Sequence, residues 1–572
     1  MKKDIFECMT CREQILSEDS RDFLVSRIQE NLFNDRFTGE TCIQETELFY
    51  RCIYVDKEYG DPIQLDKYPY NSVPKCYTLL DTQAMEQSGI LQVQNYPTLQ
   101  LQGSGVLIGI VDTGIDYQNP IFRNLDGSTR IVGLWDQTIQ EGAPPEGLMY
   151  GTEYGEETIN EALRSGNPLA IVPSVDTSSH GTFMASLAAG GVNEEEQFIG
   201  AAPDSLIAVV KLKQAKQYLK DFYLIGTDAP CYQENDIILG VTYLNRLANR
   251  MNLPLVVCVG LGTNQGSHSG NSPLSSVLDV LGNIANRAVV IGGGNEANQR
   301  HHYLGEIKDK TESKQVEIRV PEETSGFSLE LWSNPLNLLA VSIVSPSGEQ
   351  TYRFPVRSER TESYVFLLEG TVVTVDYKVF VERLDAELVF MRFQNPTEGI
   401  WKILVETIRA EEGVFHMWLP MTEFLNREVY FLESNPDYTI TEPGSTLSGI
   451  TTAFYNGKNN SIAIQSGRGY TRSERIKPDL AAPGVDVLGA GVRNQFVTRS
   501  GSSIATGIMT GAAALIMEWV VYRLQQKTID SSQVRNLLVL GTDKRLNEVY
   551  PNREWGYGSL DVYNTFETIR QI

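Results

Sequence analysis

The residue best placed for chemistry is Ser503, in the stretch Ser-Gly-Ser-Ser-Ile-Ala-Thr-Gly at residues 500–507. Small residues over 501–514 predict a helix whose first turn is crowded against other backbone, with Ser503 near its positive end. A hydroxyl is a poor nucleophile at neutral pH, so Ser503 needs a base, a group that orients the base, and donors for an oxyanion. Without such partners, the stretch is an ordinary buried helix with a serine cap.

A first candidate partner is Asp112, which follows the apolar run Val-Leu-Ile-Gly-Ile-Val at 106–111. A run that is apolar on both faces is typical of a central parallel strand. Asp112 then lies at the carboxyl end of that strand, where open α/β sheets bind ligands. The alternative is that Asp112 only begins a turn.

Two further candidates are His180 and Asn295. His180 precedes Gly-Thr and a small-residue segment that predicts a helix, so it lies at or near a helix start; it is one of five histidines. Asn295 follows three glycines and the strand-like run 288–291, and its amide can donate to an oxyanion without titrating. An ordinary buried histidine and an exposed asparagine in a glycine-rich turn are the alternatives.

The rest of this region indicates a doubly wound, mostly parallel α/β sheet. Strand-like runs recur at 206–210, 255–259 and 288–291, and apolar residues at helical spacing separate them around 237–248 and 274–285. After about residue 305, short strands, several of them alternating, predict an antiparallel β-sandwich, and the α/β pattern returns near 430. The β unit is therefore an insertion, and we expect it to serve packing or recognition rather than chemistry.

The four motifs occur in an order that resembles the subtilisin-like serine proteases (subtilases): Asp-Thr-Gly, His-Gly-Thr, Gly-Asn-Glu and Gly-Ser-Ser-Ile-Ala. The resemblance covers roughly residues 100–300 and 430–565, and it also includes Lys-Pro-Asp-Leu-Ala-Ala-Pro-Gly at 477–484. It departs mildly from the family pattern at Ser502, where a threonine is commoner, and at Phe183, where many members have a histidine.

The resemblance implies a role for each motif residue. Ser503, rather than Ser502, is the nucleophile, His180 is the general base and then acid, and Asp112 fixes the imidazole tautomer. Asn295 and the Ser503 backbone N–H form the oxyanion hole. Gly260, Leu261 and Gly262 form the backbone edge that pairs with an extended peptide substrate. The expected partner is therefore a protein or peptide substrate.

The arrangement of segments is most similar to the clostridial spore-germination (Csp) branch of subtilases. This implies a small α+β prodomain at 1–82, a catalytic domain at 83–305 and 431–572, and a jelly-roll-like insertion at 306–430. It also implies that the enzyme cuts its own leader near residues 75–85, often retains it, and activates a spore cortex hydrolase precursor by limited proteolysis. The alternatives are a non-catalytic subtilase-fold sensor of germination and a general intracellular protease.

Composition excludes several partners. The net charge is -24, with 48 Lys and Arg against 72 Asp and Glu, so nucleic acids and anionic membranes are disfavoured. No stretch reaches the roughly 18 uninterrupted apolar residues of a membrane helix, and the first residues have no apolar signal-peptide core. We expect a protein without a membrane span or classical signal peptide, located in the cytoplasm or the spore.

The cysteines and histidines suggest no metal site. Seven cysteines, most of them before residue 80, predict free thiols rather than a disulfide framework, and Cys8-x-x-Cys11 lacks the second pair of a zinc site. The adjacent His301 and His302 cannot point the same way, which favours a surface loop. We expect no required cofactor; structural calcium is common in subtilases, but no ligand set can be assigned here.

Overall fold

The computed structural model describes residues 11–26, 41–46, 49–57, 62–79, 86–308, 313–334, 336–357, 360–381, 386–408, 413–525 and 528–571. Its centre is a nine-stranded mixed sheet whose main path runs β24-β23-β12-β10-β5-β8-β6-β7, with β25 also paired to β23. Six neighbouring pairs are parallel, and β7 and β24 are antiparallel at the two ends. The strands are β5 (Leu107–Asp112), β6 (Ile131–Asp136), β7 (Thr152–Gly155), β8 (Leu206–Lys211), β10 (Leu255–Val259), β12 (Arg287–Gly292), β23 (Ile450–Asn456), β24 (Ser461–Ile462) and β25 (Leu480–Pro483).

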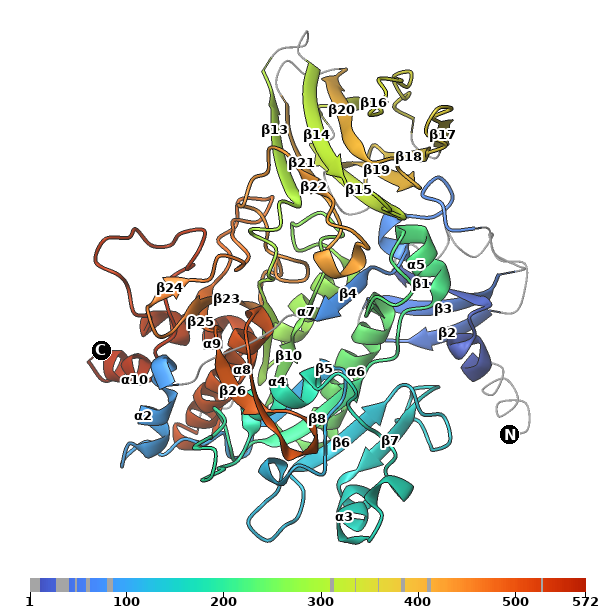
Figure 1. Ribbon diagram of the computed structural model, residues 1–572. Helices are drawn as coiled ribbons and strands as arrows, with labels where there is room; N and C mark the ends of the chain where they lie inside the picture. Colours follow the sequence, from blue (N-terminus) through green and yellow to red (C-terminus); the bar gives the residue numbers. More distant parts are fainter. Residues whose placement is uncertain are drawn as a thin grey trace.

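Helices cover both faces of this sheet (Figure 1). Alternate residues of β5 enter different clusters: Ile108 and Ile110 pack with α4 and α8, whereas Leu107 and Val111 pack with α6 and α7. Both faces are apolar, as the uninterrupted runs predict. The helices are α2 (Ile90–Asn95), α3 (Glu156–Arg164), α4 (His180–Ala189), α5 (Gln217–Tyr223), α6 (Glu234–Met251), α7 (Pro273–Gly282), α8 (Ser502–Glu518), α9 (Ser531–Leu540) and α10 (Val562–Gln571).

The described part of the leader forms an antiparallel sheet and one further strand. Strand β3 (Tyr50–Asp56) lies between β1 (Ser20–Ser26) and β2 (Thr41–Glu45). The further strand, β4 (Cys76–Leu79), leaves this sheet and pairs with β9 (Tyr232–Gln233) and β11 (Leu261–Gly262).

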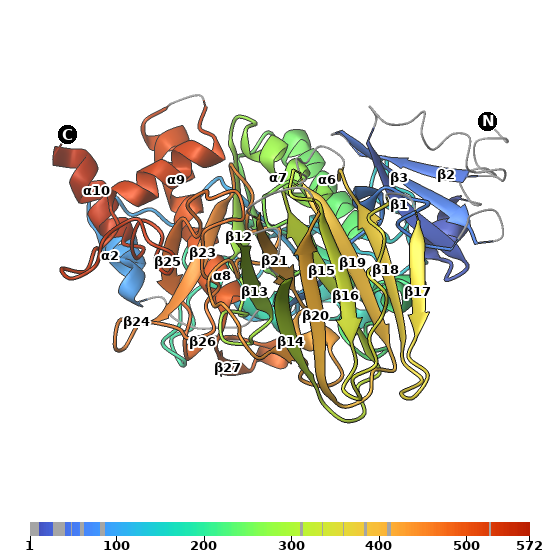
Figure 2. The same ribbon diagram turned by 90° about the horizontal axis from the view of Figure 1, so that it is seen from above.

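Two antiparallel sheets enclose an aromatic and aliphatic core in the inserted region, at the top of Figure 1 and side by side in Figure 2. The six-stranded sheet has the order β13-β21-β15-β19-β18-β17, and the four-stranded sheet has the order β16-β20-β14-β22. The limits are β13 (His302–Ile307), β14 (Ser313–Val320), β15 (Gly326–Ser333), β16 (Leu339–Val344), β17 (Thr361–Val365), β18 (Val372–Lys378), β19 (Glu387–Gln394), β20 (Gly399–Thr407), β21 (Gly413–Trp418) and β22 (Tyr430–Phe431). The name jelly roll and the four segment limits stay predictions.

Leader, catalytic region and insertion share one hydrophobic cluster. It joins Tyr70 and Val73 of the leader to Phe222 of α5 and to Trp332 and Phe390 of the insertion. The Tyr70 hydroxyl donates to the Glu330 carboxylate on β15, 2.8 Å from each oxygen. The insertion therefore packs against the leader as well as against the catalytic region.

Two expectations about histidine and cysteine are wrong. His301 and His302 are buried: His301 lies 2.6 Å from Glu296, and His302 hydrogen-bonds to His416 on the other side. Adjacent side chains point in opposite directions, but here protein covers both sides. Cys11 and Cys42 form a disulfide within the leader. Cys52, Cys76, Cys231 and Cys258 are buried free thiols, and Cys8 lies outside the described residues.

One described helix, Ser502–Arg523, is apolar and long enough on average hydropathy to cross a membrane. The protein buries 89% of its most apolar window, however, because the helix packs against α4 and the central sheet. A core helix explains this pattern.

Candidate active site

The structure brings Asp112, His180 and Ser503 together. The Nδ1 atom of His180 lies 2.8 Å and 3.0 Å from the two Asp112 carboxylate oxygens, and its Nε2 lies 3.0 Å from the Ser503 Oγ. All three side chains are buried. With Nδ1–H donated to Asp112, Nε2 is left as the acceptor that can take the Ser503 proton.

The start of α4 is held against the loop that follows β5. Asp176 accepts from the Thr113 hydroxyl at 2.8 Å and from the Thr182 N–H at 2.9 Å. The Thr113 hydroxyl in turn accepts from the Gly181 N–H. A Cβ at Gly181 would lie 2.2 Å from the Gly114 carbonyl oxygen, so only glycine permits this approach. These contacts fix the distance between His180 and Asp112.

Small residues let α8 approach α4 closely. A Cβ at Gly511 would lie 2.3 Å from the Ala201 Cβ and 2.8 Å from the Ala188 carbonyl oxygen. Gly501, just before α8, has a φ of 148° that favours glycine. Ser503 is the second residue of α8, so the sequence-based expectation of a serine in a crowded first turn agrees with the structure.

Asn295 lies beside the serine and is fixed by its neighbour Ser502. The Asn295 Oδ1 accepts from the Ser502 N–H at 2.9 Å, and the Ser502 hydroxyl accepts from the Gly294 N–H at 3.0 Å. With Oδ1 engaged, the Nδ2 group of Asn295 is left to donate. The sequence identified Asn295 but gave no sign that Ser502 orients it.

The predicted peptide-binding edge, Gly260 to Gly262, borders the same site. A Cβ at Gly260 would lie 3.3 Å from the Ser503 Cβ. Cβ atoms at Gly262 and Gly294 would lie 2.6 Å and 2.5 Å from the Thr441 side chain, which therefore stands between the two glycine walls. Sequence reasoning missed Thr441, because no motif marks it.

The leader strand β4 occupies this edge. Leu79 pairs with Leu261 and Thr78 pairs with Gly262 in an antiparallel register. On its other side, β4 pairs with β9, so it is the middle strand of a three-stranded sheet. Extended pairing of this kind is how a peptide substrate adds to a sheet edge.

The insertion reaches the oxyanion loop through Glu296, the residue after Asn295. Glu296 accepts hydrogen bonds from Asn264 at 3.2 Å, from His301 Nδ1 at 2.6 Å and from the Thr422 hydroxyl at 3.2 Å. Thr422 belongs to a short 3₁₀ turn (Thr422–Phe424) that follows β21. The two ends of the insertion thus meet at one carboxylate beside the candidate site.

Comparison with known proteins agrees with this geometry. The model of the subtilase family matches residues 103–558, which is most of the chain. The chain belongs to the subtilase family. Among solved structures, it is similar to the CspB protease of Clostridium perfringens, with 30% identity and a TM-score of 0.74 over 85% of this chain and 98% of that one. This similarity supports the Csp branch of subtilases.

Curated relatives match over shorter parts of their own length. Serine protease AprX of Bacillus subtilis is 33% identical over 23% of this chain and 33% of AprX. The C5a peptidase of Streptococcus pyogenes serotype M18 is 28% identical over 81% of this chain and 40% of that protein. The chain therefore spans well under half of each of these two relatives.

The part of the chain that the structure describes contains no group of three or more His, Cys, Asp or Glu side chains arranged to hold a metal ion. Whether calcium binds elsewhere, and whether any cofactor is needed, stay predictions.

Proposed function

We propose that this subtilase is a serine endopeptidase that cleaves peptide bonds through an acyl-enzyme. Ser503 Oγ attacks the scissile carbonyl while His180 Nε2 takes its proton, and Asp112 stabilises the imidazolium. The oxyanion accepts from Asn295 Nδ2 and the Ser503 N–H. His180 then gives its proton to the leaving amine, and water repeats the sequence to release the acid.

The continuous path of hydrogen-bonding contacts from Asp112 through His180 to Ser503 is the observation that carries this proposal. A fluorophosphonate probe tests it, because the probe phosphonylates only an activated serine. We expect the wild type to be labelled and Ser503→Ala to stay unlabelled, while Ser502→Ala keeps substantial labelling. Absence of label on the wild type, or equal labelling of Ser503→Ala, would contradict the proposal.

The same site is proposed to cut the leader. The β4 ladder pairs residue 78 with 262 and 79 with 261, so its continuation places residue 80 opposite Gly260. Gly260 abuts Ser503. Residue 80 lies outside the described residues, but the register of β4 supports a cut between Leu80 and Asp81, inside the predicted window of 75–85.

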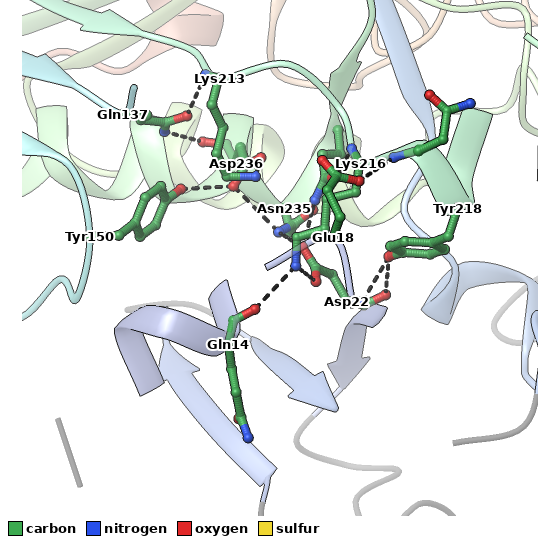
Figure 3. A network of polar contacts seen from close by, with 12 residues as sticks. Gln14, Glu18, Asp22, Gln137, Tyr150, Lys213, Lys216, Tyr218, Asn235 and Asp236 are labelled. Atoms are coloured by element: carbon green, nitrogen blue, oxygen red, sulfur yellow. Dashed lines mark hydrogen bonds and ion pairs between the residues drawn. The ribbon is translucent and has the colours of Figure 1, made fainter. Parts of the chain in front are cut away.

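Buried polar contacts support retention of the leader after the cut (Figure 3). Asp22 is fully buried and lies 2.5 Å from the Lys216 ammonium, and its second oxygen accepts from Gln233 at 2.7 Å. The Tyr218 hydroxyl accepts from the Asp22 N–H at 2.7 Å. Nearby, the Gln217 N–H at the start of α5 donates to Glu18. We call Asp22, Lys216, Tyr218 and Gln233 the leader seam.

For the physiological role, we propose limited proteolysis of a protein substrate in spores, with a cortex hydrolase precursor as the candidate. Similarity to the CspB protease and the Csp arrangement of segments support this role. Incubation of the purified protein with such a precursor tests it. One defined cleavage by the wild type, absent with Ser503→Ala, is the expected result, and an intact precursor would contradict it.

A further inference from the structure

Tyr77 of the leader is completely buried, although it ends in a hydroxyl group. It lies on β4 opposite Tyr232 and belongs to the same apolar cluster as Leu261 and Leu274. In the ladder that places residue 80 beside the reacting serine, Tyr77 is the fourth residue before the cut, counting residue 80 as the first. Its pocket is therefore part of the substrate-binding groove.

The far end of this pocket is polar. The Tyr77 hydroxyl lies 3.5 Å from the Glu234 Oε1 and also hydrogen-bonds to the Ser272 side chain. Burying a phenol without partners is costly, so these two groups are what allows a tyrosine to occupy an otherwise apolar pocket.

Glu234 is fixed before any substrate arrives. It is the first residue of α6 and is fully buried, and its Oε1 accepts from the Leu274 N–H at 3.0 Å. Its Oε2 accepts from the Lys75 N–H at 3.2 Å. A carboxylate oxygen held in this way can accept a further hydrogen bond from a phenol.

We propose that Glu234 and Ser272 make this pocket selective for tyrosine over phenylalanine at the fourth position before the cut. This inference rests on the proposed function. The substrate class is then an extended segment with a tyrosine at that position, of which Tyr-Thr-Leu-Leu at residues 77–80 is this chain's own example.

Selectivity arises because phenylalanine leaves the carboxylate oxygen with one acceptor site unused in a buried pocket. Glu234 keeps its Leu274 donor, so the loss is smaller than for a group left with no partner. We expect about a ten-fold lower kcat/KM for phenylalanine, which corresponds to about one hydrogen bond to a charged group.

The test uses quenched fluorescent peptides spanning residues 74–84, with Tyr or Phe at position 77, and the processed wild-type protein. A control pair carries the same Tyr-to-Phe exchange at position 79, where we expect a ratio near one. In Glu234→Leu and Ser272→Ala, the Tyr-to-Phe ratio at position 77 should fall towards one, and either variant that folds suffices.

Equal rates for the two peptides at position 77, or faster cleavage of the phenylalanine peptide, would overturn the inference. So would failure to cleave either peptide while a fluorophosphonate still labels Ser503, because the leader strand then does not mimic a substrate. Loss of labelling as well would instead contradict the proposed function.

Discussion

The catalytic cluster and the leader seam both bury charged side chains, but different forces hold them in place. At the catalytic cluster, backbone packs on backbone: Gly181 lies against Gly114, and Gly511 lies against Ala201. At the leader seam, side chains from distant segments pair, with Asp22 against Lys216 and Gln233. The first arrangement resists any added atom, whereas the second depends on each charge keeping its partner.

The largest expected effect is on chemistry. His180→Ala removes the base and should lower kcat for a peptide substrate by about 10⁶, a value taken from subtilisin. Leader docking should persist, because the leader seam lies on other elements. Peptide hydrolysis and co-purification of a separately expressed leader measure the two properties. Activity within ten-fold of the wild type would contradict the assigned role.

At the leader seam, Asp22→Ala leaves the Lys216 ammonium buried without its carboxylate partner. Breaking a buried pair in this way costs about 3–5 kcal/mol, so the processed leader should bind about 10² to 10³-fold more weakly. The matched control is Asp19→Ala, whose ion pair with Lys57 is exposed and should contribute about 0–1 kcal/mol. Leader release on dilution, followed by size-exclusion chromatography, measures both variants. Equal release would show that the leader seam does not depend on buried charge.

Close packing at α8 is tested by Gly511→Ala. The added Cβ would meet Ala201 at 2.3 Å, so we expect a loss of about 1–3 kcal/mol in the free energy of unfolding. Gly226→Ala is the control, because nothing lies within 4 Å of its added atom. Urea unfolding measures both variants in a Ser503→Ala background, which prevents self-cleavage. Equal stability of the two would contradict the packing argument.

The smallest expected effect concerns pH. Burial raises the pKa of Glu442 from 4.5 to about 7. The folded state therefore holds this proton more tightly, and the stability that Glu442 contributes is complete below about pH 4.5 and lost as the pH rises to about 7. Glu442→Gln does not titrate, so its unfolding free energy should fall less between these values, by about 1–3 kcal/mol. Urea titrations at several pH values measure this difference, and an unchanged pH slope would contradict it.

Sequence reasoning worked best where one short motif fixes one local structure. The apolar run before Asp112 and the small residues after Ser503 fold into β5 and α8, and both packing faces follow from composition. Order along the chain then indicated which motifs belong together. The structure places these residues and His180 within hydrogen-bonding distance of one another.

Sequence reasoning failed where a contact joins ordinary residues far apart in the chain. Nothing in the spacing of Cys11 and Cys42 marks them as a disulfide pair, and Thr441 belongs to no motif. Asp22 and Lys216 are common residue types with 194 positions between them. The prediction for His301 and His302 failed for a related reason, because protein from two other segments covers both sides of them.

The most direct test of the account is an intact-mass measurement on the purified protein. The account predicts that the wild type separates into a fragment ending at Leu80 and one starting at Asp81, and that Ser503→Ala remains a single uncut chain. A wild type that stays uncut, or a Ser503→Ala variant cut at the same bond, would contradict it.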